Sequence, residues 1–328
     1  MLKACVVGAG AIGGFLGTRL ALTGAASVAA LARGTTLVAL RDHGWRLESD
    51  GQQLQAPAAL AADDPRELGV QDLLIITVKA PALATLAPTL APLIGPETLI
   101  LPAMNGVPWW FSIGLPALGR EPLASVDPGG AIAAALPFAR VLGCVVHASA
   151  SLRAPGVAVH RMGRGLIIGE PDGGDSARVR TLAALFTRAG FEVGCSTNIR
   201  YDVWYKLWGN MTMNPVSALT GATLDRVLGD DLLRAVCSAA MREAAAIGAR
   251  IGCEVRESPE DRHAVTRKLG ASKTSMLQDV ESGRPLELDA LVGSVREIGA
   301  RVGVATPTVD ALFALTRVFA RVRGLYPP

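Results

Sequence analysis

The sequence has few charged and few aromatic residues for its length. Of 328 residues, 19% are charged and 5% are aromatic, and the formal net charge is only +3. No run of lysine and arginine forms the basic footprint of a nucleic-acid-binding surface, and the aromatic residues are too sparse to interleave with one. The composition therefore predicts no nucleic-acid partner, while the small positive excess would suit an anionic ligand.

Cysteine and histidine lack the spacings of disulfide frameworks and metal sites. None of the five cysteines belongs to a CxxC pair, and their number is odd. We therefore expect no disulfide framework and a reducing compartment. The four histidines also lack metal-site spacing, so we expect no metal. These residues are Cys5, Cys144, Cys195, Cys237, Cys253, His43, His147, His160 and His263.

Long hydrophobic runs are missing as well. Residues 1–7 lead directly into glycines, without the apolar segment and cleavage site of a signal peptide. Residues 80–96 carry no charge, but Pro81, Pro88 and Pro92 interrupt this short stretch. We therefore expect a cytoplasmic protein that does not associate with membranes.

The first half of the chain alternates continuous apolar runs with helix-like segments. Such β-α-β alternation predicts a parallel sheet that is covered on both faces. The middle of the chain favours an antiparallel hairpin added to this sheet, with a turn at Pro155-Gly156, and then a helix and a last strand. The expected strands are 3–8, 27–32, 72–78, 98–101, 144–152, 157–160 and 191–195, and the expected helices are 11–23 and 175–189.

From Asn198 onward, strand-like runs vanish and helical periodicity dominates. The clearest expected helices are Leu224–Gly248 and Pro285–Val302. The sequence therefore predicts an α/β protein with two domains. Residues 1–197 would form a Rossmann-type, doubly wound dinucleotide-binding domain, and residues 198–328 an all-helical substrate and catalytic domain. We expect the active site in the cleft between them, and the apolar helical domain could also support a homodimer.

A glycine-rich turn of the form G-x-G-x-x-G follows the first expected strand and opens the first expected helix. This context is typical of dinucleotide binding. The first glycine permits a tight turn, the second lets the backbone approach a pyrophosphate, and the third lets helix and strand pack closely. The helix N-terminus offers N–H groups to the anion. The alternative is a turn that binds no ligand. The expected cofactor-binding residues are Gly8, Ala9, Gly10, Ala11, Ile12 and Gly13.

The end of the second expected strand indicates which nicotinamide cofactor binds. An NAD enzyme usually has an acidic residue here, hydrogen-bonded to the ribose 2′-OH. The stretch Leu31–Gly34 has no acid, and Arg33 could hold a 2′-phosphate through two hydrogen bonds. We therefore expect NADPH. The alternative is an ordinary exposed arginine.

Two further strand ends carry polar residues. Lys79 follows the strand at 72–78, and Asn105-Gly106 follows the strand at 98–101. The carboxyl ends of the strands in a doubly wound sheet are where ligands bind. We therefore expect both positions near the ligand, although Lys79 alone could equally be structural.

The helical half contributes a third group of polar residues. On a helix, Lys206, Asn210 and Asn214 fall on one face. Ser275 and Glu287 lie twelve residues apart further along the chain. Each has an ordinary alternative: Asn214 precedes a proline and could end a helix, Ser275 could be an N-cap, and Glu287 could stabilise a helix N-terminus.

Taken together, these residues resemble the ketopantoate reductases, also called 2-dehydropantoate 2-reductases. The resemblance covers essentially the whole chain, because the order and spacings of all the motifs match. They are the glycine turn, Arg33, Val78-Lys79, Asn105-Gly106, Lys206/Asn210/Asn214-Pro215, and Ser275-Met276-Leu277-Gln278-Asp279 with Glu287.

The resemblance implies reduction of ketopantoate to (R)-pantoate with NADPH, a step toward pantothenate and coenzyme A. It implies that Lys206 is the general acid and that Glu287 assists at the substrate. It places Asn105, Asn210, Asn214 and Ser275 at the substrate, and Lys79 beside both cofactor and substrate; Asn105 is also a candidate cofactor contact. A lysine suits this chemistry, because its ammonium can stabilise and protonate the oxygen of a ketone under hydride attack.

The sequence departs from the family pattern around the Asn-Gly pair. Met104 stands where many members have glutamine, and Trp109 and Trp110 follow shortly after. The tryptophans could reshape the substrate pocket, or they could pack against the helical domain or a second subunit. The alternatives are therefore a reductase of another 2-oxo acid, a non-catalytic NADPH-binding regulator, and a β-hydroxyacid dehydrogenase, whose pattern lacks the Ser-Met-Leu-Gln-Asp motif.

Overall fold

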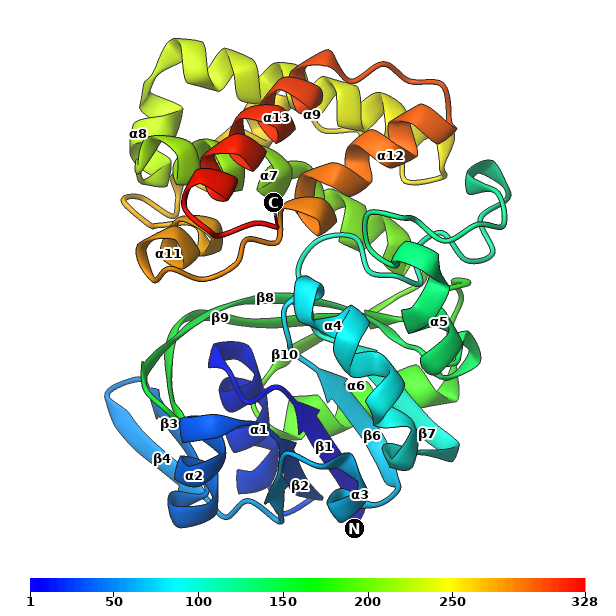
Figure 1. Ribbon diagram of the computed structural model, residues 1–328, viewed down its shortest axis with the longest axis vertical. Helices are drawn as coiled ribbons and strands as arrows, with labels where there is room; N and C mark the ends of the chain where they lie inside the picture. Colours follow the sequence, from blue (N-terminus) through cyan, green and yellow to red (C-terminus); the bar gives the residue numbers. More distant parts are fainter. Residues whose placement is uncertain (328) are drawn as a thin grey trace. The chain divides into compact units, whose positions relative to one another are not determined.

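The computed structural model describes residues 1–327, which divide into two compact units (Figure 1). The first unit comprises residues 1–104 and 131–202. The second comprises residues 105–130 and the chain from Val203 onward. The predicted fold class is confirmed, because the first unit holds a parallel sheet with helices and the C-terminal region is helical.

A five-stranded parallel sheet forms the centre of the first unit, in the order β5-β2-β1-β6-β7. Its inner strands consist almost entirely of buried apolar residues, as expected where both faces are covered. In register, Val7 pairs with Leu31 and Ile76, and Ile76 pairs with Pro102, so four strands end at one edge. The strands are β1 (Leu2–Val7), β2 (Ala26–Leu31), β5 (Ala61–Ala62), β6 (Gln71–Ile76) and β7 (Ile94–Pro102).

The first unit also contains a second five-stranded sheet, in the order β10-β9-β3-β4 with β8 paired to β9. The expected hairpin is confirmed as the antiparallel pair β8–β9. Its expected place in the first sheet is wrong, because β9 pairs with β3 and β10 instead. The strands are β3 (Trp45–Ser49), β4 (Gln52–Ala56), β8 (Gly143–Ala154), β9 (Val157–Gly169) and β10 (Glu192–Ser196).

Helix α1 (Ala11–Leu22) packs against the second sheet through small residues and one aromatic. A Cβ at Gly14 would lie 2.9 Å from Ala158, and one at Gly17 would lie 2.7 Å from the Trp45 ring. The ring of Phe15 stacks on His160 with 4.6 Å between centroids. The glycines that follow the G-x-G-x-x-G turn therefore allow the helix to approach both β3 and β9.

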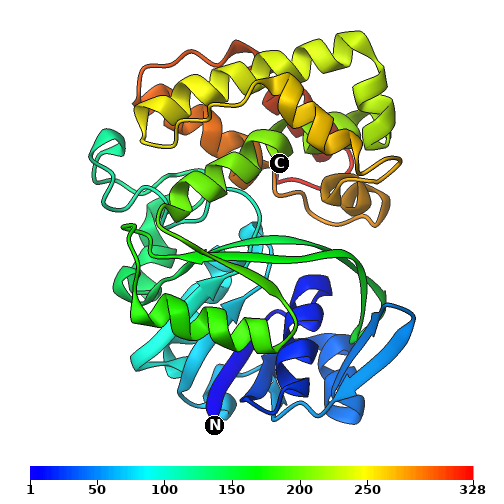
Figure 2. The ribbon, with the colours of Figure 1, turned by 180° about the vertical axis from the view of Figure 1, so that it is seen from behind.

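The remaining helices of this unit are short, apart from α2 and α6. They are α2 (Gly34–His43), α3 (Pro65–Leu68), α4 (Ala80–Leu86), η1 (Ala87–Leu93), α5 (Ala131–Ala135), η4 (Phe138–Arg140) and α6 (Ala177–Arg188). The short turn η3 (Pro128–Gly130) ends the part of the second unit that precedes α5. Figure 2 shows α6 from behind, beside the long strands of the second sheet.

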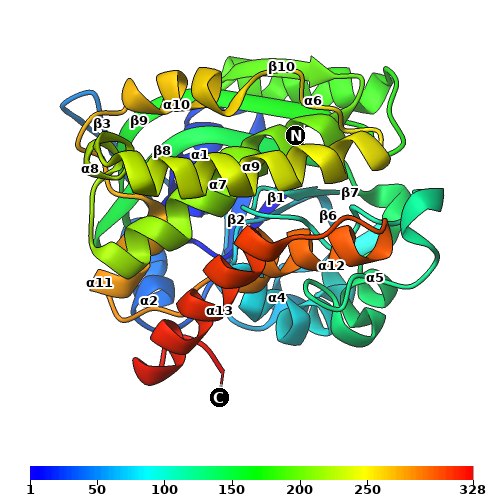
Figure 3. The same ribbon diagram turned by 90° about the horizontal axis from the view of Figure 1, so that it is seen from above.

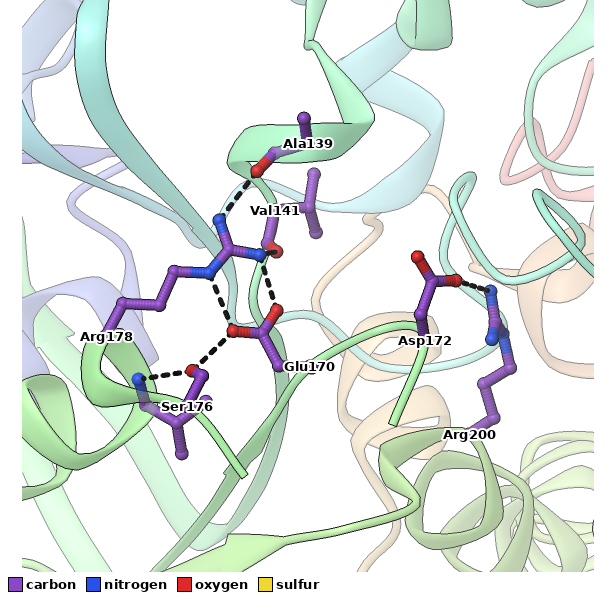
Figure 4. A network of polar contacts seen from close by, with 8 residues as sticks. Ala139, Val141, Glu170, Asp172, Ser176, Arg178 and Arg200 are labelled. Atoms are coloured by element: carbon purple, nitrogen blue, oxygen red, sulfur yellow. Dashed lines mark hydrogen bonds and ion pairs between the residues drawn. The ribbon is translucent and has the colours of Figure 1, made fainter. Parts of the chain in front are cut away.

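Arg178 fastens the start of α6 to neighbouring segments (Figure 4). Its guanidinium binds the carboxylate of Glu170 and donates to the carbonyls of Ala139 and Val141. Ser176, the N-cap of α6, donates to the same carboxylate. The Arg178 guanidinium and the Ser176 hydroxyl together hold the pKa of Glu170 below its usual value, although burial acts in the opposite direction.

The second unit is helical, and no strand occurs among its described residues (Figure 3). The expected helix at 224–248 is two helices that break at Asp230. The helix expected at 285–302 begins only after Glu287, passes through a π turn and ends at Arg301, because residues 284–287 have no regular secondary structure. The elements are α7 (Ile199–Thr220), α8 (Leu224–Gly229), α9 (Asp231–Arg250), α10 (Pro259–Arg267), α11 (Ser275–Glu281), η5 (Asp289–Gly293), α12 (Ser294–Arg301), α13 (Pro307–Val322) and η2 (Pro116–Leu118).

Residues 105–130 are compact with the second unit, whereas the sequence placed them with residues 1–197. The carboxylate of Glu297 accepts hydrogen bonds from the backbone N–H groups of Ala124 and Ser125. The guanidinium of Arg301 donates to three carbonyls of the same segment, those of Leu118, Glu121 and Pro122. Two charged side chains on α12 thus hold a segment that has little regular structure of its own.

No helix within residues 1–327 has the length and hydrophobicity that crossing a membrane would require.

His263 is a buried histidine in the helical unit. Its Nε2 lies 2.9 Å from the hydroxyl oxygen of Ser238, and its side chain is almost fully enclosed. Burial lowers the pKa of His263, and Arg267 and Arg234 act in the same direction against the opposing effect of Glu260. The folded protein therefore favours the neutral imidazole.

We expect this histidine to make stability dependent on pH. A histidine whose pKa is lower in the folded state binds a proton more readily when unfolded. Its stabilising contribution is therefore complete above the unfolded pKa of about 6.5 and is lost as the pH falls below that value. Thermal unfolding between pH 5 and 8 should show a shallower acid loss for His263→Gln than for the unsubstituted protein. His43→Gln, at an exposed position, is the matched control and should leave the pH dependence unchanged.

Candidate active site

The glycine turn after β1 has the conformation that its sequence predicts. Gly8 has a φ of +96°, and a Cβ there would lie 2.5 Å from a methyl group of Val78. A Cβ at Gly13 would lie 2.2 Å from the carbonyl oxygen of Gly8. Both positions therefore exclude any side chain. The hydroxyl of Thr77, at the end of β6, donates to the Gly8 carbonyl over 2.5 Å and fixes the turn.

The N-terminus of α1 is left open by the same turn. Gly10 is the N-cap and therefore provides no side chain to cap the helix, and the first turn carries no acidic residue. A Cβ at Gly10 would meet no atom within 4 Å, in contrast to Gly8 and Gly13. The backbone N–H groups that begin at Ala11 and Ile12 thus face a place where an anion could approach.

Two more of the predicted residues follow strands that end at this edge. Arg33 is the N-cap residue of α2, two positions after β2, and it is exposed. Within residues 1–327, its guanidinium makes no hydrogen bond or ion pair, so it is available to a ligand. Lys79 is the N-cap residue of α4 after β6, and its side chain is half-buried.

Lys206 and Asn105 meet in the second unit. The ammonium of Lys206 donates a hydrogen bond of 2.8 Å to Oδ1 of Asn105, although 101 positions separate them in the sequence. Both side chains are half-buried. An ammonium that is partly enclosed and oriented by a neutral amide can act both as an electrostatic partner and as a proton donor.

Helix α7 is oriented by its tryptophans. The indole N–H of Trp204 donates to the carbonyl of Ala244, and that of Trp208 donates to Met241, both on α9. Trp204 and Trp208 are almost fully buried, whereas Lys206 and Asn210 keep partial exposure. The aromatic side of the helix thus packs on α9, which leaves the polar stripe on another face.

Asn214 continues that stripe and reaches Ser275. Its amide Nδ2 lies 3.5 Å from the Ser275 hydroxyl, and Asn214 itself is buried. The helix does not end here, because α7 runs through Pro215 to Thr220. Ser275 is the first residue of α11 and is exposed, while its neighbour Thr274 is the N-cap and accepts from the N–H of Leu277. The capping alternative for Ser275 is therefore wrong.

Glu287 lies immediately before the helical turn that starts at Leu288. Its side chain is only 8% exposed, which is unusual for a carboxylate at a helix start. Among the predicted residues of this unit, hydrogen bonds join Lys206 to Asn105 and Asn214 to Ser275. The side chain of Asn210 makes no hydrogen bond within the described residues.

Trp109 and Trp110 are interior residues. They are 2% and 1% exposed, and the ring of Trp110 lies 6.4 Å from that of Phe111. Phe111 in turn stacks on Trp204 of α7 at 6.0 Å. The two tryptophans therefore pack in the second unit, which was one of the two alternatives that the sequence left open.

Sequence reasoning missed the contact that holds Asn105. A Cβ at Gly106, where φ is +81°, would lie 2.5 Å from the carbonyl oxygen of Ala290. That carbonyl also accepts a hydrogen bond of 2.8 Å from the N–H of Val107. The glycine was visible in the sequence, but its partner lies 184 positions later in a helix that looks regular.

Both halves of this chain are similar to a known protein family. Residues 4–173 match the family described as Ketopantoate reductase PanE/ApbA, and residues 198–320 match Ketopantoate reductase PanE/ApbA C terminal. The chain belongs to the ketopantoate reductase family. Like its family, it is therefore an oxidoreductase.

Individual relatives agree with this assignment. A 2-dehydropantoate 2-reductase from Mesorhizobium japonicum is 42% identical over 99% of this chain and 100% of its own length. A protein from Ralstonia solanacearum MolK2, known as a crystal structure, is 55% identical with a TM-score of 0.94, over 99% of this chain and 100% of that one. The ternary structure of D-mandelate dehydrogenase with NADH and anilino(oxo)acetate has a TM-score of 0.85 over 99% of this chain and 100% of that one. At 21% identity, this last likeness shows the fold alone.

Proposed function

We propose that this protein reduces 2-dehydropantoate (ketopantoate) to (R)-pantoate with NADPH, a step in the biosynthesis of pantothenate and coenzyme A. The observation that carries the proposal is the hydrogen bond between Lys206, on the polar stripe of α7, and Asn105, after β7. An oriented ammonium beside neutral amides is the arrangement that carbonyl reduction requires, and the chain belongs to the family named for this reaction.

The first unit has the features needed to hold the cofactor. The open N-terminus of α1 at Gly10 suits a pyrophosphate, since a side chain is absent there and backbone N–H groups are presented. Arg33, exposed at the end of β2, suits the 2′-phosphate that distinguishes NADPH from NADH. Lys79 follows β6 at the same sheet edge and would contribute to this region. When bound, NADPH supplies the hydride.

Lys206 has the central role in the chemistry of the protein. Negative charge grows on the ketone oxygen as the carbon is reduced, and the ammonium stabilises that charge and then donates a proton to it. Asn105 Oδ1 accepts one N–H of the ammonium and thereby limits the directions in which the other two can point. Glu287 is buried and lies shortly before the π turn in the sequence. Its carboxylate would accept a hydrogen bond from a substrate hydroxyl.

Asparagine and serine side chains would hold the rest of the substrate. Asn210, Asn214 and Ser275 offer amide and hydroxyl groups, which can bind a carboxylate and a hydroxyl without adding charge. Asn210 is half-buried and its side chain makes no hydrogen bond within residues 1–327, so a ligand could bind its amide without breaking a bond of that side chain.

A different 2-oxo acid is the main alternative substrate. Met104 stands where the family resemblance implies a glutamine in many members, and it is half-buried and directly precedes Asn105, so the groups near the substrate would differ from the family pattern. Trp109 and Trp110 no longer argue for this alternative, because both are buried. A non-catalytic regulator is disfavoured, because such a protein would not need the Lys206–Asn105 pair.

The test is steady-state oxidation of NADPH by the purified protein with ketopantoate and with a panel of other 2-oxo acids. We expect the highest kcat/KM for ketopantoate. A higher value for another acid would keep the chemistry and reject the substrate. No turnover with any acid, while NADPH still binds, would reject the enzyme and favour the regulator.

A further inference from the structure

A π turn lies between Glu287 and helix α12. Residues Asp289–Gly293 adopt this wider turn, in which the N–H of Ser294 donates to the carbonyl of Asp289 five residues earlier. An α-helix would direct that N–H to Ala290 instead. Such single turns are rare and are found frequently at functional sites.

The carbonyl of Ala290 points out of this turn toward residues 105–107. It accepts from the backbone N–H of Val107 over 2.8 Å and from the hydroxyl of Ser294 over 2.9 Å. Gly106 lies against the same peptide group, so close that any Cβ would overlap the Ala290 carbonyl. The backbone on the C-terminal side of Asn105 is therefore fixed by the π turn.

Asn105 in turn contacts the proton donor. Its side chain is one residue from the Gly106–Ala290 contact, and its Oδ1 receives the Lys206 ammonium over 2.8 Å. An acceptor on an ammonium favours the charged form, because the hydrogen bond is lost or weakened on deprotonation. Movement of the Asn105 backbone would therefore change both the direction and the proton affinity of Lys206.

The C-terminal residues anchor the π turn from its other side. The hydroxyl of Tyr326 donates to the carboxylate of Asp289 over 2.6 Å, and the carbonyl of Leu325 accepts from the N–H of Leu286. These two bonds bracket Glu287 in the sequence. Burial raises the pKa of Asp289 above its ordinary value.

We propose that the π turn Asp289–Gly293, anchored by Tyr326 and bonded to Val107, positions Asn105 against Lys206 and so tunes the proton donor. Gly106, Ala290 and Tyr326 are positioning residues in this arrangement. The catalytic role in this inference rests on the proposed function. The effect on the titration of Lys206 does not, because it can be measured without substrate.

The experiment compares Gly106→Ala with Gly119→Ala. Both glycines lie in residues 105–130 and have positive φ, +81° and +75°, so the backbone strain of an alanine is matched. A Cβ at Gly119 meets no atom within 4 Å, whereas one at Gly106 strikes Ala290. Lysines labelled with ¹³C at Cε would be titrated by NMR in the full-length protein, which has only five lysines. The Lys206 signal is identified by its loss in Lys206→Ala.

We expect Gly106→Ala to lower the titration midpoint of Lys206 by about one pH unit, the size of a hydrogen bond to a charged group. The alkaline limb of the kcat profile should move down with it, and Gly119→Ala should match the unsubstituted protein in both. In an Asn105→Ala background, Gly106→Ala should cause no further shift.

Tyr326→Phe is a second variant that removes only one hydroxyl, and it should produce a smaller shift in the same direction. If Gly106→Ala does not fold, the titration of Lys206 in Tyr326→Phe tests the proposal by itself. Unchanged midpoints in the folded variants would overturn the proposal, and lower thermal stability without a shift would show a merely structural role. If the unsubstituted protein reduces no 2-oxo acid, the proposed function fails while the titration still tests this inference.

Discussion

Replacing Lys206 with alanine is expected to reduce kcat by about 10²- to 10⁴-fold, the usual contribution of a general acid. The substitution removes the ammonium that Asn105 holds at 2.8 Å, and no other lysine or arginine lies on the α7 stripe with Asn210 and Asn214. Cofactor affinity should change little, because the glycine turn and Arg33 belong to the other unit. Stopped-flow turnover and fluorescence titration with NADPH would measure the two effects separately.

The matched control is Lys268→Ala, at an exposed position after α10. It removes the same charge and should keep normal turnover. Lys206→Arg is informative as well, because a guanidinium keeps the positive charge but has a pKa too high to donate its proton readily. A Lys206→Ala variant with near-normal kcat would show that this lysine is not the acid.

Replacing Arg33 with alanine is expected to weaken NADPH binding while leaving NADH binding nearly unchanged. The guanidinium is exposed at the end of β2 and makes no bond within residues 1–327, so its loss should not disturb the fold. Hydrogen bonds between charged groups contribute about 1.5–3 kcal/mol, which corresponds to roughly a tenfold to hundredfold change in Kd. Isothermal titration with each cofactor gives the ratio directly.

Two controls separate recognition of the phosphate from general electrostatics. Arg120→Ala lowers the net charge equally at another exposed position and should leave the NADPH preference intact. Arg33→Lys keeps the charge but loses the planar pair of donors. Its preference for NADPH over NADH should therefore lie between those of Arg33→Ala and the unsubstituted protein. An unchanged preference in Arg33→Ala would contradict the phosphate role.

Local patterns in the sequence were sufficient to predict the strand ends and the polar stripe. The glycine turn could be recognised because its motif directly follows an apolar run and opens a helical segment. The steric contacts of Gly8 and Gly13 with Val78 and Thr77, which follow β6, emerge only from the structure. The stripe of Lys206, Asn210 and Asn214 could be recognised because helical periodicity alone places these residues on one face. The spacing from Ser275 to Glu287 became meaningful only through the family resemblance.

Features that depend on distant contacts could not be predicted. The strands β3 and β4 are short, and the pairing of β3 with β9 joins residues more than a hundred positions apart. Residues 105–130 have little periodicity, and their place in the second unit depends on two α12 side chains, Glu297 and Arg301. The π turn has the hydrophobic pattern of an ordinary helix, and only the contact between Gly106 and Ala290 reveals its use.

The reaction proposed for this protein is the reduction of the ketone carbon of ketopantoate by NADPH. The most direct measurement uses NADPH deuterated at C4 of the nicotinamide, each stereoisomer in turn, and mass spectrometry of the product. We predict (R)-pantoate with one deuterium at C2 from one of the two stereoisomers, and no such product from Lys206→Ala on the same time scale. Unlabelled pantoate from both stereoisomers, or unchanged ketopantoate in the presence of folded protein that binds NADPH, would contradict this prediction.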